Sequence, residues 1–163
     1  MELVPALKGQ YLAGLAMLRE CVEKCPDDLW SSGTHPRTFW RIAYHAAFYT
    51  DLYLSKTLED FTAWHRHVDQ ARILWDDDEN GVPPTETTYS QADVAEHIRD
   101  IESRVDSLLT DMDLAAGHSG FSWYKIPKLD HQLLNIRHLG VHVGQLQELL
   151  YAQGVELDWV SKR

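Results

Sequence analysis

Apolar residues recur at steps of three and four along four stretches of the chain, at about residues 2–24, 39–54, 90–109 and 130–153. This spacing is the period of an α-helix that buries one side. In the second stretch the apolar residues continue nearly all the way round, which indicates a helix in the middle of the domain. Because no stretch alternates convincingly as a strand does, the sequence predicts an all-α fold. We expect a four-helix bundle that forms a single domain over residues 1–163.

The inward face of the last predicted helix mixes apolar and polar side chains. We expect this stripe to contain Leu134, His138, Val141, His142, Gln145 and Leu149. An imidazole without a partner in an apolar interior loses about 1–3 kcal/mol of hydrogen bonding. The two histidines of the stripe must therefore be satisfied by another group. On the same helix, Gly140 and Gly144 predict a close approach by a neighbouring helix.

The segment 57–89 carries no sustained period and is long for a connection within a compact domain. It contains Gly81-Val82-Pro83-Pro84 and the acidic run Asp76-Asp77-Asp78-Glu79, which we interpret as a solvated loop. The aromatic stretch 61–65 predicts a short helix that folds back as a lid. Directly after the segment 57–89, Ser90 followed by Asp93 is a capping pattern for the next helix. Beyond the last helix, we expect Leu157 and Trp159 to dock on the surface.

The charge of the chain excludes several classes of partner. Its formal net charge is −10, which opposes binding to nucleic acids and to anionic membranes. We find no targeting pattern and no apolar run free of charges, so we expect a soluble, cytoplasmic protein. The two cysteines, Cys21 and Cys25, lie one helical turn apart, where a disulfide would be strained, so we expect reduced thiols.

Three histidines form the strongest candidate site. His138 and His142 stand four residues apart on one helix, so their rings can converge on one point. His45 lies in the centre of the most apolar helix and is the third candidate ligand. Three neutral nitrogens with one open position are the usual form of a catalytic zinc site, although nickel, iron and copper also accept such ligands. Taken singly, each histidine has another interpretation, as a core imidazole bonded to a backbone carbonyl or a carboxylate.

Other polar residues are weaker candidates for the same site. Gln145, one turn after His142, can bond a ligand's ring nitrogen or a metal-bound water; the alternative is an amide at a helix interface. Arg41, one turn before His45, can meet a carboxylate of a ligand, or form a surface ion pair. His131 is about 10.5 Å along the helix from His138, too far for the same ion, and we expect it at the mouth of the pocket.

Two segments resemble a known family, the DinB/YfiT-like metal-binding four-helix bundles. They are residues 39–45, which end in the helix-centred His45, and residues 138–146, which resemble the family's His-x-x-x-His-x-Gly-Gln signature. The resemblance implies an up-down-down-up topology, frequent homodimers, and one divalent metal ion at His45, His138 and His142, with zinc or nickel first and iron as an alternative. Relatives include S-transferases and isomerases that use the thiols mycothiol or bacillithiol.

Three functions are compatible with these patterns. In the first, a metal ion activates a small-molecule thiol for transfer to an electrophile, or a water for hydrolysis, and no catalytic residue of the protein is identified. In the second, the protein binds metal in a stress response without turnover. In the third, the histidines are core residues of a purely structural bundle. A thiol S-transferase is the leading hypothesis.

We also expect a homodimer. Besides the resemblance, the loops and tail contain more aromatic residues than a small core readily hides. These are Trp64, Trp75, Trp123 and Trp159.

Overall fold

The computed structural model describes residues 3–75 and 88–163, and these residues are all-helical. The acidic run and the Gly-Val-Pro-Pro stretch of the sequence analysis lie outside the described residues. The elements are α1 (Leu3–Glu23), α2 (Asp27–Trp30), α3 (Phe39–Leu54), the 3-10 helix η1 (Asp69–Arg72), α4 (Gln91–Thr110) and α5 (Lys128–Tyr151). Within the described ranges there is no strand, which confirms the all-α prediction.

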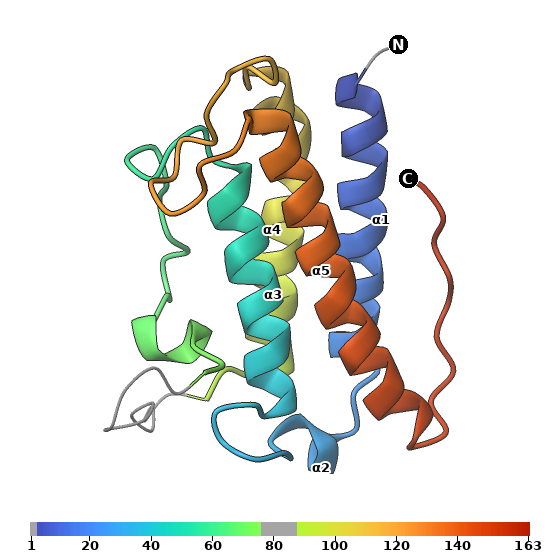
Figure 1. Cartoon of the computed structure of the whole chain (residues 1–163). Coiled ribbons are helices and arrows are strands. Elements are labelled where there is room, and N and C mark those ends of the chain that lie inside the picture. The colour runs from blue at the N-terminus through green and yellow to red at the C-terminus, as the bar shows by residue number, and fades with distance from the viewer. Residues whose placement is uncertain (1–2, 76–87) are drawn as a thin grey trace.

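The four long helices pack side by side along most of their length (Figure 1). Helix α3 packs against α4 and α5, and α1 packs against the same two helices. Helices α1 and α3 therefore lie across the bundle from each other. At Gly14 on α1, a methyl group would come within 2.7 Å of Leu139 Cδ2 on α5, so this glycine permits a close approach of the two helices.

Helix α3 is buried on nearly every side, as the continuous apolar pattern predicted. Fifteen of its 16 residues are buried, and these include three that carry formal or potential charge, Arg41, His45 and Asp51. A helix in this position can present polar side chains only toward other parts of the protein. Each of these groups must therefore find its partner inside the fold.

The start of α4 is fixed by the expected capping box. Ser90 Oγ accepts a hydrogen bond from the backbone N–H of Asp93 at 3.1 Å, and the Asp93 carboxylate accepts one from the backbone N–H of Ser90 at 3.0 Å. Both donors would otherwise lack a partner at the helix end.

The connection after α3 folds back along the bundle, but its short helix lies elsewhere than predicted. Residues 61–64 are irregular, and the helical turn is η1, at Asp69–Arg72. Arg41 explains the position of this turn: its guanidinium donates to the backbone carbonyls of Gln70 and Ile73. Arg41 is only 2% exposed and bonds to backbone carbonyls, so the surface ion pair considered in the sequence analysis does not form.

Several surface predictions were wrong. Val141 is 53% and Leu149 40% exposed, because the stripe that faces the core is rotated toward Leu139, Val143 and Leu146. The space beside Gly140 and Gly144 is open, so no helix among the described residues approaches them closely.

The tail and the loop tryptophans match the expectations only in part. The tail runs beside α1 (Figure 1), where the Arg163 N–H donates to Gly9 O at 3.2 Å. Leu157 packs against the core, but Trp159 is 79% exposed. Trp64, expected among the leftover aromatic residues, is buried at 8% exposure.

Two further expectations can be compared directly with the structure. Cys21 and Cys25 are both buried free thiols, as expected. Each helix in the described ranges falls short of the length or the apolarity needed to cross a bilayer.

Candidate metal centre

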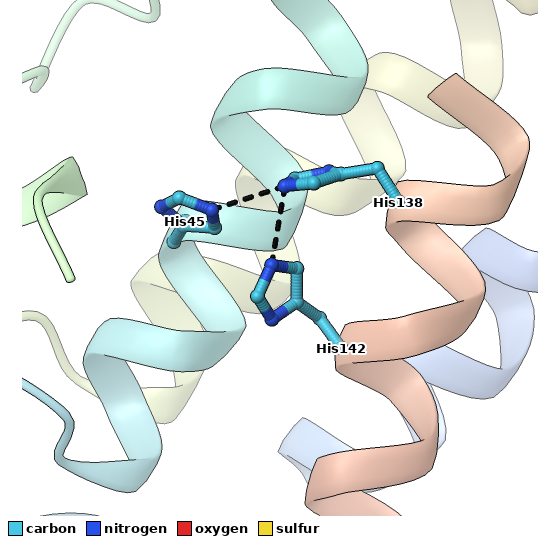
Figure 2. Close-up of side chains that lie close together, drawn as sticks. All are labelled: His45, His138 and His142. Carbon is cyan, nitrogen blue, oxygen red and sulfur yellow. Dashed lines mark hydrogen bonds between the residues drawn. The ribbon is translucent and has the colours of Figure 1, made fainter. Parts of the chain in front are cut away.

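Helices α3 and α5 bring the three candidate histidines together. His45 comes from α3, and His138 and His142 come from successive turns of α5, so the three rings meet between the two helices (Figure 2). His138 Nε2 lies 3.1 Å from His45 Nε2 and 3.1 Å from His142 Nε2. One nitrogen from each ring lies within 4.8 Å of both others, an arrangement that could hold a metal ion.

Hydrogen bonds at Nδ1, the ring nitrogen that does not meet the other histidines, fix the protonation of two of these rings. His45 Nδ1 lies 2.6 Å from the backbone carbonyl of Arg72, and His142 Nδ1 lies 2.9 Å from Gln145 Oε1. Because a carbonyl oxygen can only accept, each Nδ1 carries the hydrogen. The Nε2 atoms of His45 and His142 therefore present bare lone pairs to the centre.

His138 cannot satisfy both lone pairs. A neutral imidazole carries one N–H, so His138 Nε2 can donate to His45 or to His142 but not to both. Its Nδ1 has no hydrogen-bond partner among the described residues. A divalent cation resolves this conflict, because it accepts all three lone pairs at once. Ligands of a tetrahedral zinc ion at about 2.0–2.1 Å lie roughly 3.3 Å apart. His138 Nε2 lies at a similar distance, 3.1 Å, from each of the other two Nε2 atoms.

Burial keeps the three rings neutral, which is the form that binds metal. Burial lowers the pKa of His45 to about 3 and that of His138 to about 4. The pKa of His142 is also lowered by burial, although its hydrogen bond to Gln145 opposes this shift. Ion binding at neutral pH would therefore displace few protons from these side chains.

Arg41 and η1 support the site through the backbone. Arg41 donates to the carbonyls of Gln70 and Ile73, which lie on either side of Arg72 in the sequence. Arg72 O is the acceptor for His45 Nδ1. Arg41 thus supports the site by fixing the backbone segment whose Arg72 carbonyl orients His45.

Gln145 takes the supporting position that the sequence suggested. Its Oε1 accepts from His142 at 2.9 Å and from Arg37 Nη2 at 3.5 Å. Because arginine can only donate, its contact identifies this atom as the amide oxygen. Arg37 is exposed, so it places a positive charge near the triad at the protein surface.

His131 does not lie at a pocket mouth. It is completely buried and packs against Tyr53, Phe121 and Tyr124, with ring centroids 4.8–5.3 Å away. Neither of its nitrogens has a partner among the described residues. It lies about two turns before His138 on α5, where these three aromatic rings cover it.

A cavity of about 280 Å³ opens in front of the triad. It is lined by His45, Tyr49, Tyr53, Trp75, Tyr124 and His138. Tyr49 also lines a second hollow of about 340 Å³, together with Phe48 and Leu52.

Sequence reasoning missed the Arg72 carbonyl and most of the cavity wall. A backbone acceptor leaves no side-chain pattern, so Arg72 could not be found. Tyr49 and Tyr53 follow His45 at intervals of four residues, and that spacing places all three on one face of α3. This signal was present in the sequence. Trp75 and Tyr124 come from connections, where no period applies.

Comparison with protein-family models, with curated proteins and with solved structures found no match to this chain. The site must therefore be interpreted from its own geometry.

The metal-free protein should lose stability as the pH falls from 7.5 to 5.5. An unfolded histidine has a pKa of about 6.5, whereas the folded values for His45 and His138 are about 3 and 4. Below about pH 7 the unfolded chain therefore binds more protons than the folded protein. The stability that these histidines contribute is fully present above pH 6.5 and is lost as the pH falls toward their folded pKa values. The slope reaches about 1.4 kcal/mol per pH unit for each such histidine.

Urea denaturation at pH 7.5, 6.5 and 5.5 measures this dependence. The His138→Gln variant, which lacks one of these groups, should show a shallower decline, and the same change at exposed His118 should not. Equal slopes in the wild type and His138→Gln would contradict the assignment.

Proposed function

We propose that the protein is a metal-dependent enzyme of the DinB-like class that transfers a small-molecule thiol to an electrophile. His45, His138 and His142 hold one divalent ion, zinc or nickel first and iron as the alternative. The observation that carries this proposal is the convergence of three Nε2 atoms, two of them held as bare lone pairs by hydrogen bonds from behind.

The donor set determines the chemistry. A divalent ion held by three neutral imidazoles retains its full charge and lowers the pKa of a bound thiol or water. Arg72 O and Gln145 keep two of the rings in the binding tautomer. The cavity reaches His45 and His138, so a reactant can approach the centre from this side. Arg37 adds a positive charge near His142 that favours an anionic reactant.

An external nucleophile fits the residues of the site. The cavity-lining residues, all in the described part of the chain, include no serine, threonine, cysteine or lysine. Burial raises the pKa of the Cys21 and Cys25 thiols to about 12, so both stay protonated and are poor nucleophiles. The hydroxyls of Tyr49 and Tyr53 also line the cavity, but burial raises the pKa of both, so they stay protonated. A thiol or water brought to the centre would then supply the attacking atom.

The up-down-down-up topology is part of this proposal. In Figure 1, α1 and α5 run from the top of the view to the bottom, and α3 and α4 run upward. These directions support the up-down-down-up order, and α1 lies diagonal to α3.

Metal-loaded protein should couple a bacterial thiol to a chlorinated arene. The sulfur forms a bond to the ring carbon, chloride leaves, and the thiol proton passes to the solvent. Conjugate formation should require a thiol from the tested panel and should fall to the uncatalysed rate in His142→Ala, while His118→Ala keeps the wild-type rate. Ester or amide cleavage without thiol dependence would indicate a hydrolase, and no turnover of either kind would indicate a metal-binding protein.

Gln145→Ala should weaken metal binding by about 10–100-fold, because His142 then loses the acceptor that fixes its tautomer. Competition with a chromophoric chelator measures the affinity. Gln147→Ala is the matched control, since Gln147 lies on the same helix about 200° round the axis. If both variants bind metal as tightly as the wild type, Gln145 does not position His142.

We further propose that the homodimer forms through the outer face of α5. Leu133 and Val141 are each 53% exposed on this face, and the open space beside Gly140 and Gly144 permits a close approach by a second copy. Exposed apolar side chains grouped on one face are typical of interfaces.

Light scattering at high micromolar concentration should give the mass of a dimer for the wild type and of a monomer for Val141→Glu. Leu58→Glu, at an apolar position that is 44% exposed in another part of the surface, should remain a dimer. A monomeric wild type would contradict the dimer, and a dimeric Val141→Glu would contradict this interface.

A further inference from the structure

The wall of the 280 Å³ cavity is made entirely of flat rings. Besides His45 and His138, it consists of Tyr49, Tyr53, Trp75 and Tyr124. Tyr49 is central: its ring centroid lies 4.6 Å from that of His45, 5.6 Å from that of Tyr53 and 6.5 Å from that of Trp75. An aliphatic pocket would accept any compact apolar group, but a wall of rings favours a flat aromatic one through edge and face contacts.

The size of the cavity restricts the ligand further. Pockets for drug-sized ligands have volumes of about 300–1,000 Å³, and this cavity lies just below that range. Its tyrosines and histidines meet at tilted or near-perpendicular angles, for example 78° between Tyr53 and Tyr124 and 70° between Tyr49 and His138. Such a wall presents both ring edges and ring faces to a single inserted ring.

The surroundings of the cavity favour a negative charge on that ligand. The chain as a whole has a net charge of −10, yet the residues that line the cavity, all within the described ranges, include no carboxylate. The nearby carboxylate of Asp69 is paired with Arg72. Arg72 Nη1 donates to the Tyr49 hydroxyl at 2.8 Å. That bond uses a lone pair of the phenol oxygen and leaves its O–H free to donate to a ligand. Arg37 contributes a second cation on the side of His142.

We infer that this cavity binds a small aromatic anion, a single planar ring whose charged group faces the three histidines. This inference rests on the proposed function, because it takes the metal centre as the point to which the charged group is directed. It adds the class of reactant to that function: the cavity selects an aryl compound over an aliphatic compound of the same size.

Benzoate and cyclohexanecarboxylate form a matched pair of probes, since both are anions at pH 7.5 and they differ mainly in the flatness of the ring. In cobalt-loaded protein, titration of the visible cobalt spectrum gives the affinity for each. Benzoate should bind roughly tenfold more tightly, the preference expected for one or two aromatic contacts. Trp75→Leu and Tyr124→Leu should each reduce this ratio, whereas Trp159→Leu, at a residue 79% exposed on the tail, should leave it unchanged.

Measurement of both probes by saturation-transfer NMR on metal-free protein separates this inference from the proposed function. Protein that binds no cobalt but still prefers benzoate would refute the metal proposal and support the aromatic cavity. Protein that binds cobalt but takes both carboxylates equally would overturn the cavity assignment alone. A preference for benzoate that persists in both Trp75→Leu and Tyr124→Leu would also overturn it. Trp75 is 40% exposed, so its variant should fold even if Tyr124→Leu does not.

Discussion

Two hydrogen bonds on the far side of the histidine rings determine what the centre of this protein can do. One joins His45 Nδ1 to the Arg72 carbonyl, and the other joins His142 Nδ1 to the Gln145 amide. Both acceptors lack a hydrogen, so both rings must place their lone pairs toward His138. Without these bonds the three rings could exchange hydrogens among themselves and form an ordinary polar cluster. With them, the centre holds more lone pairs than donors.

The rest of the fold maintains this imbalance. Burial on nearly all sides of α3 removes water from His45, and the same desolvation lowers the pKa of the ring, so protonation cannot relieve the conflict near neutral pH. Arg41, buried one turn away, holds the η1 backbone in place by donating to Gln70 and Ile73. An arginine in an apolar helix is expensive unless its donors are used. Here two hydrogen bonds from Nη2 fix the loop that carries the acceptor for His45, while Nε has no partner among the described residues.

Much of the helical framework and the histidine triad could be predicted from the sequence, for a physical reason. Helix periodicity and the four-residue spacing of His138 and His142 are local properties, and α3 could be recognised from its continuous apolar pattern. The rotation of α5 could not be predicted as well: Val141 is as apolar as Val143, and only packing against α1 and α3 decides which one is buried. For the same reason His131 was placed at a surface and lies among aromatic rings.

The connections were the least predictable part. The sequence offered no visible partner for Arg41, so a ligand was a reasonable expectation. Its actual partners are backbone carbonyls, which any sequence supplies and no pattern reveals. The wall of the cavity combines Tyr49 and Tyr53, which the spacing on α3 could have revealed, with Trp75 and Tyr124 from segments without a period. The chemistry of the centre could thus be inferred from local spacing, whereas the shape of its pocket depends on long-range folding.

X-ray absorption at the zinc edge of untagged, zinc-loaded protein tests the central claim most directly. The geometry predicts one ion per chain with three imidazole nitrogens at about 2.0–2.1 Å and a fourth light ligand. A shell of six oxygens, a sulfur ligand at about 2.3 Å, or protein that retains no zinc after dialysis would contradict the assignment of His45, His138 and His142 as a metal centre.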